Sequence, residues 1–186
     1  MLQHWRSWMK PIPWKFVKSW NCTACGACCK GFDVILGYKE WVDIIRKYGI
    51  EVTQPSIAKL YLKKRSDGSC VFLSRFYDMW FCTLQHMKPR ACKLWPFKVY
   101  NEPKYGRSNQ ASYDLHGKRL FIYVDPSCTG IIWGNPTREF MYGTMREFVE
   151  IALGLREKQF YSTALLEERI FQKEHLTIRR YFRKLV

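Results

Sequence analysis

The chain has 186 residues, of which 47% are hydrophobic, so it is long enough for one domain with a buried core. Its 31 basic and 16 acidic side chains give a net charge of +15, which favours a polyanionic partner such as RNA, DNA or an anionic membrane surface. No stretch approaches the roughly 18 apolar residues of a membrane span, and the N-terminus lacks the apolar core of a signal peptide, so we expect a cytoplasmic protein with reduced thiols.

The first predicted segment is a basic arm over residues 1–20. It holds four tryptophans and four basic residues but no acid, and Pro11 and Pro13 prevent a continuous helix. Interleaved cations and aromatic rings suit contact with phosphates and stacking on bases. Packing of the tryptophans onto the core is an equally good interpretation. The candidate nucleic-acid-binding residues of the arm are Trp5, Arg6, Trp8, Lys10, Lys15 and Lys18.

A cysteine run follows the arm, and it holds Cys22, Cys25, Cys28 and Cys29. Thiolates at intervals of three residues can turn toward one point, as a soft metal ion or an iron–sulfur cluster requires. The run lacks the fourth cysteine of a ferredoxin motif, and no second Cys-x-x-Cys completes a zinc ribbon. Further ligands must therefore come from distant positions, and the candidates are the single cysteines Cys70, Cys82, Cys92 and Cys128.

Eight cysteines divide into two sets of four, which matches either two Cys₄ zinc ions or two [4Fe–4S] clusters. The adjacent Cys28 and Cys29 point in different directions in most backbone conformations, so we expect them to serve two centres unless one of them is not a ligand. Four disulfides are the less favoured alternative. Each four-thiolate centre carries roughly −2 net charge, which basic neighbours such as Lys30, Arg90 and Lys93 would offset.

The middle of the chain is predicted to mix short helices and strands. Apolar residues at spacings of three and four predict a helix over residues 38–48, which Gly49 ends. A second short helix is expected from Pro55 to a basic run, and that run adds Lys63, Lys64 and Arg65 to the candidate nucleic-acid-binding residues. Residues 70–73 and 80–84 are predicted to form a hairpin. Prolines on both sides of Cys92 favour one short helix there.

Three strands and a helical end are predicted for the remainder. Strands are expected at 97–100, 111–115 and 118–124, the last covered on both faces, and a tight loop then presents Cys128. Asn135 before a proline predicts the start of a helix, with a break near Gly154. The basic amphipathic tail contributes four further candidate nucleic-acid-binding residues, Arg179, Arg180, Arg183 and Lys184.

These elements predict a small α+β domain whose cysteine-rich centre is held together by metal. We expect short antiparallel strands flanked by helices, because loops rich in glycine and proline pack poorly without a metal. The predicted organisation is a basic tryptophan-rich arm at 1–20, a cysteine-rich metal-binding core at 21–135 and a C-terminal helical extension at 136–186.

The order of the motifs resembles a known family. Cys-x-x-Cys-Gly-x-Cys-Cys is followed by a lone cysteine with Phe-Leu, another lone cysteine, a Pro-x-x-Cys segment ending in Pro-Phe, and a late Cys-x-Gly. Over about residues 20–135 this is similar to the CxxCxxCC or YkgJ-type family of putative zinc- or iron-chelating proteins, often labelled iron–sulfur oxidoreductases. Lys88 and Lys93 stand where arginine is more usual, and Trp95 replaces Phe or Tyr. The resemblance implies metal binding more strongly than any reaction.

Several functions remain open from the sequence. A binding module would use structural metals and a basic surface for structured RNA, for example in a ribosome or another ribonucleoprotein. The alternatives are an iron–sulfur oxidoreductase and a cluster-dependent protein-modifying enzyme. The four histidines are isolated, and neither a phosphate loop nor a Gly-x-Gly-x-x-Gly motif is present, so no catalytic residues are assigned. Contact with a membrane surface is not favoured, and a merely solvated basic surface is the remaining alternative.

Overall fold

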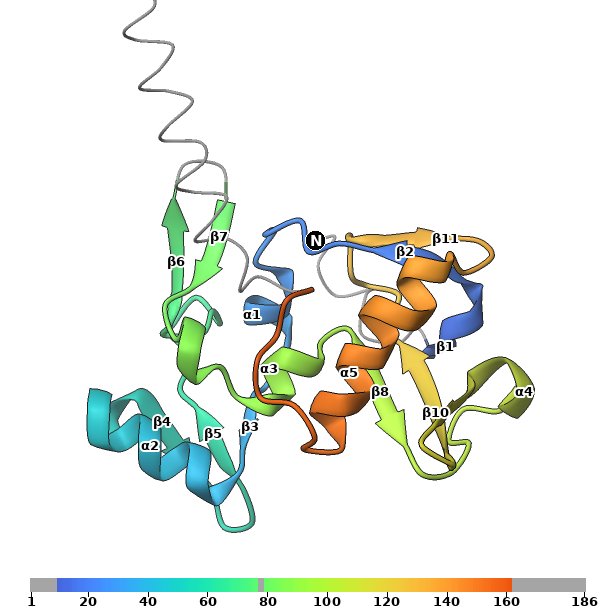
Figure 1. The fold of residues 1–186 in the computed structure, drawn as a ribbon. Coiled ribbons are helices and arrows are strands. Elements are labelled where there is room, and N and C mark those ends of the chain that lie inside the picture. The colour runs from blue at the N-terminus through green and yellow to red at the C-terminus, as the bar shows by residue number, and fades with distance from the viewer. Residues whose placement is uncertain (1–9, 77–78, 162–186) are drawn as a thin grey trace, which may run out of the picture.

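The computed structural model describes residues 10–76 and 79–161 of the chain. The α+β prediction is confirmed, because short antiparallel strands and helices alternate along the chain. Two hydrophobic cores divide the fold into two lobes, with helices α1 (Ala27–Gly31) and α3 (Arg90–Leu94) between them (Figure 1). Seven of the candidate nucleic-acid-binding residues lie outside the described residues: Trp5, Arg6, Trp8, Arg179, Arg180, Arg183 and Lys184.

The first lobe is built on a four-stranded antiparallel sheet. Its central strand β10 (Lys118–Val124) pairs with β1 (Ile12–Pro13), β8 (Phe97–Tyr100) and β9 (Ser112–Leu115). The strand predictions for this part of the chain are therefore confirmed, with β9 starting one residue late. Leu120, Ile122 and Val124 enter the first core while Tyr123 is buried on the other face, so β10 is covered on both sides as expected.

A two-stranded ribbon and a helix complete this lobe. The ribbon pairs β2 (Val17–Trp20) with β11 (Ile131–Trp133). The helix has a π-helical turn, η5 (Phe140–Thr144), that continues as α5 (Met145–Ala152). The predicted helix start at Asn135 was wrong, because helical geometry begins at position 138. The Thr137 hydroxyl accepts the Phe140 amide at 3.2 Å and so caps the helix instead.

The described part of the N-terminal segment is built into this lobe. After β1 it forms a short 3₁₀ turn, η2 (Trp14–Phe16), and then β2. Trp14 and Trp20 are buried in the first core, where the Trp20 ring lies 5.2 Å from Phe148 and 5.6 Å from Phe97. For these two tryptophans the packing interpretation is therefore confirmed.

The second lobe contains helix α2 and a three-stranded sheet. Helix α2 (Tyr38–Tyr48) has the predicted bounds, and Gly49 follows it with a positive φ of 86°. The 3₁₀ turn η3 (Ile50–Val52) then leads into the sheet, whose strands are β3 (Ile35–Leu36), β5 (Leu60–Leu62) and β4 (Thr53–Pro55), in that order.

The predicted short helix beginning near Pro55 was wrong. Residues 53–62 instead form β4 and β5, with Gln54 opposite Tyr61 and Pro55 opposite Leu60. The pairing gives this segment's backbone groups partners across the turn, and β5 gains a second partner in β3. A proline is tolerated at this place because β4 is an edge strand.

A hairpin and a short helix connect the second lobe to the centre. Strands β6 (Leu73–Phe76) and β7 (Met79–Cys82) form a hairpin, as predicted, with Leu73 opposite Cys82. The predicted bounds of the first strand were wrong, because it begins at Leu73 and continues through residues expected to link the two strands. The 3₁₀ turn η4 (Gln85–Met87) then leads to α3, which carries Cys92 as predicted.

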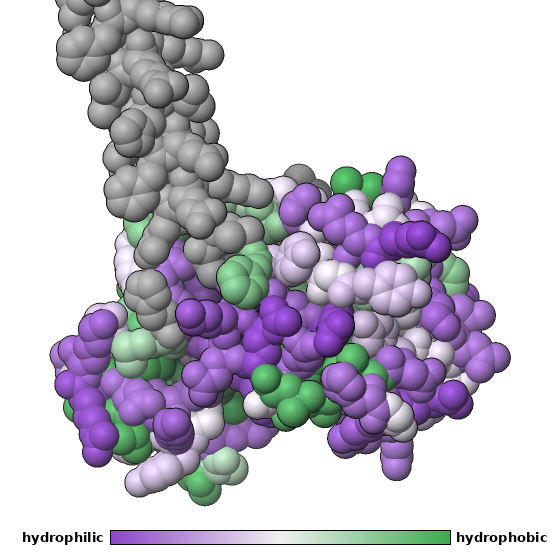
Figure 2. Space-filling model, in the orientation of Figure 1, coloured by the Kyte–Doolittle hydropathy of each residue, from purple (hydrophilic) through white to green (hydrophobic). Residues whose placement is uncertain are grey.

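The remaining short helix, α4 (Ser108–Ala111), lies at the far end of the first lobe, next to β10 (Figure 1). Hydrophilic side chains cover most of the face in Figure 2, and apolar ones gather in small separate patches. Within the described ranges, no helix combines the length and the apolar character that crossing a membrane requires.

Candidate metal centre

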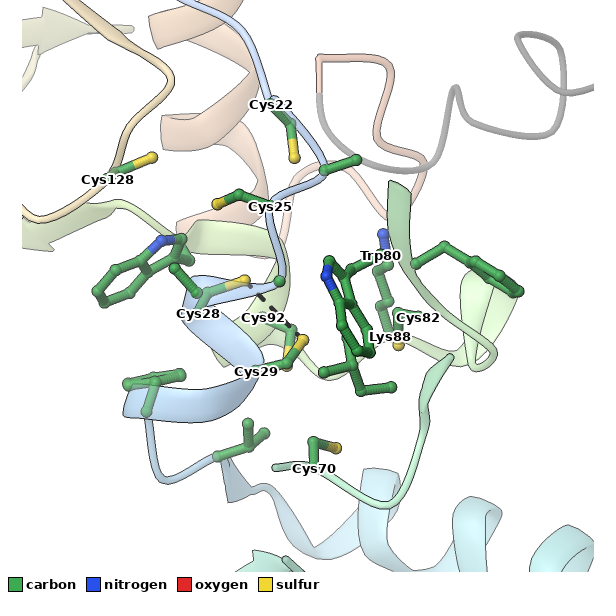
Figure 3. A pocket seen from close by; sticks show the side chains of 18 of the residues that line it. Cys22, Cys25, Cys28, Cys29, Cys70, Trp80, Cys82, Lys88, Cys92 and Cys128 are labelled. Atoms are coloured by element: carbon green, nitrogen blue, oxygen red, sulfur yellow. Dashed lines mark hydrogen bonds between the residues drawn. The ribbon is translucent and has the colours of Figure 1, made fainter. Parts of the chain in front are cut away.

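All eight cysteines line one cavity between the two lobes (Figure 3). The rest of its wall is aromatic, aliphatic or small, apart from one threonine and one lysine. The cavity therefore collects residues 106 positions apart, from Cys22 to Cys128, around one apolar space of about 70 Å³. One water-sized sphere needs about 10–15 Å³ on this measure, so the thiols surround room for more than one ion.

The segment over residues 22–29, here called the cysteine turn, has left-handed backbone conformations that direct its cysteines toward the cavity. Ala24 and Gly26 have φ values of +53° and +70°, and α1 begins directly after them. The Cys29 amide donates to the Gly26 carbonyl at 3.0 Å. A side chain at position 26 would lie 2.9 Å from Trp80, so glycine is required both by its φ and by the close approach of the indole.

Three backbone hydrogen bonds bring the distant cysteines to this turn. The Asn21 amide donates to the Gly130 carbonyl at 3.1 Å, which holds the Cys128 loop beside Cys22. The Trp80 amide donates to the Ala24 carbonyl at 2.8 Å, which docks the β6–β7 hairpin. The Cys70 amide donates to the Cys29 carbonyl at 2.8 Å, so the chain before that hairpin is fixed to α1.

The cysteines divide between the two cores. Cys22 and Cys128 pack against the first core. Cys70 belongs to the second core, and the cysteines packed against that core are Cys29, Cys82 and Cys92. The site therefore lies at the boundary between the two lobes, here called the seam. A group that bound thiols from both sides of this boundary would join the two cores.

Hydrogen bonds to sulfur distinguish the cysteines beside the first lobe. The Trp20 indole N–H donates to the Cys128 sulfur at 3.3 Å, and the Thr129 hydroxyl donates to the Cys25 sulfur at the same distance. Although burial opposes it, the bond from Thr129, with help from the Ala27 amide, lowers the pKa of Cys25 below its ordinary value. Donors of this kind stabilise a thiolate and orient it, as the outer shell of a metal site does.

Cys28 and Cys29 form a coupled pair at the middle of the cavity. Their sulfur atoms are 3.9 Å apart. The hydrogen bond from Cys29 lowers the pKa of Cys28 to about 7, and the same bond raises the pKa of Cys29. One thiolate of this pair is thus stabilised by the thiol beside it, and either sulfur can be the donor.

Burial dominates the other five thiols. It raises the pKa of Cys22 to about 11. Burial likewise raises the pKa values of Cys70, Cys82, Cys92 and Cys128. Metal binding here must therefore displace protons from buried thiols, so it depends on pH and on the strength of the metal–sulfur bonds.

Lys88 is the one charged residue among the described residues that line the cavity. It is only 5% exposed, and burial lowers its pKa. Burial still raises the pKa values of Cys22 and Cys82, on opposite sides of the seam, but the positive charge of Lys88 offsets part of that rise. The sequence-based choice of neutralising residues therefore missed this lysine.

The three basic residues expected to offset the metal charge do not line the cavity. Lys30 Nζ lies over the Trp80 ring, 4.2 Å from its centroid. Lys93 Nζ donates to the Glu157 carbonyl at 3.0 Å, and Arg90 is exposed. Lys88 was missed because it is buried in a cavity lined by residues from distant parts of the sequence, which no local pattern shows.

The donor set suits a thiophilic metal. Eight thiols line the cavity, and no carboxylate or imidazole does. Zinc and iron–sulfur centres both accept four thiolates, whereas calcium and magnesium need oxygen ligands. In the part of the chain that the structure describes, no three potential ligand side chains are close enough to hold a single ion.

The described candidate nucleic-acid-binding residues lie on two lobes. Lys10, Lys15 and Lys18 are exposed on the first lobe and Lys63 on the second. Three of the six described candidates are engaged within the fold. The Lys15 ammonium donates to the Asn109 carbonyl at 2.7 Å, Lys64 pairs with Asp33 at 2.6 Å, and Arg65 donates to the Val71 and Leu73 carbonyls. Arg65 thus has a structural contact that its place in a basic run did not reveal.

Comparison with known proteins agrees with this donor set. No curated protein and no solved structure gives a significant match to the chain. The family model CxxCxxCC, described as a putative zinc- or iron-chelating domain, matches residues 21–128, which is the span from the cysteine turn to the last cysteine. The chain therefore belongs to the CxxCxxCC family of zinc- or iron-chelating domains.

Proposed function

We propose that the chain binds metal in two four-cysteine centres that join its two lobes. The observation that carries this proposal is that all eight cysteines line one cavity at the seam between the cores. Adjacent Cys28 and Cys29 sit where the two groups of cysteines meet (Figure 3). The metals would act first as structural elements, because binding energy at such a site becomes folding energy.

The first centre would use Cys22, Cys25, Cys28 and Cys128. Cys22 and Cys128 pack against the first core, and the bond between Asn21 and Gly130 holds their segments together. Thr129 follows Cys128 and donates to Cys25, so the same loop reaches a third ligand. Cys28 precedes Cys29 on α1 and would complete this set, which leaves Cys29 for the second centre.

The second centre would use Cys29, Cys70, Cys82 and Cys92. All four lie in or against the second core. The amide of Cys70 is bonded to the carbonyl of Cys29, and Leu73 stands opposite Cys82 in the hairpin. Each centre then combines part of the cysteine turn with ligands supplied by one side of the seam.

Zinc and [4Fe–4S] clusters are the two cofactors that this donor set fits. Either would be held by thiolates from the cysteine turn and neutralised in part by Lys88. We place the protein in the cytoplasm, since its eight cysteines are free thiols and reducing conditions preserve them as ligands. An iron–sulfur oxidoreductase remains the alternative function, and it requires the cluster form.

Anaerobic purification followed by metal and sulfide analysis tests the proposal. We expect two zinc ions per chain, or about eight iron and eight sulfide with broad absorption near 400 nm. A reducible cluster, seen as an electron paramagnetic resonance signal after dithionite, would favour the oxidoreductase. One metal centre or none per fully folded chain would contradict the two-centre proposal.

We also propose that the basic surface binds structured RNA, in a ribosome or another ribonucleoprotein. The supporting observation is that Lys10, Lys15, Lys18 and Lys63 are exposed in a chain of net charge +15. Neutralising phosphates releases counterions, so the logarithm of the binding constant should fall linearly with the logarithm of salt concentration. Fluorescence anisotropy with a labelled RNA hairpin measures this slope. Absence of binding at 50 mM salt, or binding that does not change with salt, would overturn the proposal.

A further inference from the structure

An open groove of about 590 Å³ lies on the first lobe, away from the cysteines. One wall is β1 with the preceding proline, a second is the loop before α4, and a third is the end of β11. These three elements, α4, β1 and β11, lie at the end of the molecule away from α2 (Figure 1). The metal proposal makes no use of this groove. Its described lining residues are Lys10, Pro11, Ile12, Pro13, Phe16, Tyr105, Arg107, Trp133, Gly134 and Asn135.

Three aromatic side chains of the groove are accessible to a ligand. Trp133 is 45% exposed, Phe16 is 39% exposed and Tyr105 is 36% exposed. Large apolar side chains grouped on a surface in this way mark an interaction site more often than the same residues scattered singly. Exposed aromatic rings can stack with the bases of unpaired nucleotides.

The walls that carry these rings are fixed. The Gly134 amide donates to the Phe16 carbonyl at 2.9 Å, which ties β11 to the turn before β2. The ladder between β11 and β2 has an irregularity between Ile132 and Trp133, and a bulge of this type redirects a side chain. Tyr105 is braced edge-on by Tyr123, with ring centroids 5.2 Å apart. A rigid aromatic surface loses little entropy when it binds.

Cations accompany the rings, and no acid lines the groove among the described residues. The Arg107 guanidinium lies over the Phe16 ring at 5.6 Å, and Lys10 stands at the end of the same groove. Arg107 has a positive φ of 49°, an uncommon conformation for a residue other than glycine. Lys18 flanks the groove, since its Cβ is 3.5 Å from where a side chain at Gly134 would begin.

We propose that this groove binds an unpaired stretch of RNA, with bases stacked on Trp133 and Phe16 and phosphates held by Arg107 and Lys10. The inference rests on the proposed RNA partner and assigns it a binding face. Charge complementarity selects a polyanion, and the exposed rings select an unpaired strand over a duplex, whose bases are already stacked. An anionic membrane would match the charges but would not need the separate rigid rings.

The test uses full-length, metal-loaded protein and fluorescein-labelled oligo(U) in anisotropy titrations. We expect Trp133→Ala to weaken binding at least about tenfold, since stacking contributes strongly for each base. Arg107→Gln should weaken binding and lower the salt slope by about one. Two controls should bind as the unchanged protein does: Tyr142→Ala removes another exposed ring, and Arg46→Gln makes the same charge change on α2. Matching thermal unfolding curves would show that the variants fold.

The other probes separate the possible outcomes. If the protein binds an RNA duplex more weakly than oligo(U), the assignment of the groove to an unpaired strand is supported. The affinity for oligo(dT) should also fall in Trp133→Ala and Arg107→Gln, because stacking does not read the 2′-hydroxyl. If unchanged protein binds RNA but Trp133→Ala and Arg107→Gln bind equally well, the groove is wrong and the RNA proposal stands. If it binds no RNA at all, both proposals fail. Preference for vesicles containing phosphatidylserine, lost in the same variants, would overturn the RNA assignment in favour of a membrane.

Discussion

Replacing Cys70 by serine is expected to remove one metal centre and leave the other bound. Cys70 lies in the second core, whereas Cys128 packs against the first. Each single variant, Cys70→Ser or Cys128→Ser, should therefore retain about half of the metal, one zinc ion or about four iron atoms per chain. The double variant should retain none. Metal analysis after gel filtration measures all three.

The adjacent pair gives a sharper form of the same test. If Cys28 belongs with Cys128, Cys28→Ser combined with Cys128→Ser should lose no more metal than either single change. If Cys29 belongs to the other centre, Cys29→Ser combined with Cys128→Ser should lose all of it. Non-additive loss marks residues that act as one unit, and additive loss marks independent sites.

Ala27→Ser is a suitable control, because it places the same hydroxyl beside Cys28 without removing a thiol. It should keep full metal content. If Cys28→Ser combined with Cys29→Ser loses no more metal than either single change, both sulfurs bind in the same centre. Their 3.9 Å separation also permits that arrangement, so the experiment decides between two defined ligand sets. Loss of a centre should also lower the thermal unfolding temperature, since the metals join the lobes.

Local patterns were sufficient to predict elements whose stability depends on short-range features. The periodicity of residues 38–48 gave α2 with its correct bounds, and prolines around Cys92 gave α3. Apolar residues on both alternating sets of 118–124 gave a covered strand. In each case the residues that decide the structure lie within one turn or one strand of each other.

The errors arose where the partners are distant or where two signals compete. The segment after Pro55 forms strands because β3 and β4 both pair with β5, and β3 lies before α2 in the chain. At the last helix, Asn135 before a proline predicted the start, but Thr137 is the residue that caps the helix. The division into two cores has no local signal, because each core combines segments from separate parts of the sequence.

For the site, the sequence predicted a set of ligand candidates but not their surroundings. Cysteine spacing made all eight thiols candidates, and all eight line the cavity. Nothing in the spacing indicated that Trp20 and Thr129 donate to sulfur, or that Gly26 must admit Trp80. These contacts cross between the lobes or between distant loops, so only the folded chain shows them.

Lys88→Met is expected to weaken metal binding at both centres by about 10- to 100-fold, the usual size of an outer-shell effect. The substitution keeps an unbranched side chain of similar length and removes the charge. Lys88 is near thiols assigned to the first centre, Cys22 and Cys28, and to the second, Cys82 and Cys92. Competition with a zinc chelator measures the affinity, and Lys88→Arg should restore most of it. If the centres are iron–sulfur clusters, their midpoint potential should become more negative, because losing a nearby cation makes it harder to add an electron.

Lys93→Met is the matched control. It makes the same charge change on α3, but its ammonium donates to the Glu157 carbonyl and does not line the cavity. Equal affinities for the two variants would show that the Lys88 charge has no role in metal binding. The metal-free proteins separate this effect from folding. If the Lys88 charge acts on the metal-bound thiolates, Lys88→Met should lower the thermal unfolding temperature more in the metal-loaded protein than in the metal-free protein, because a ligand that binds only the folded state stabilises it in proportion to its affinity. An equal lowering in both states would show that Lys88 stabilises the fold itself and not the metal-bound state.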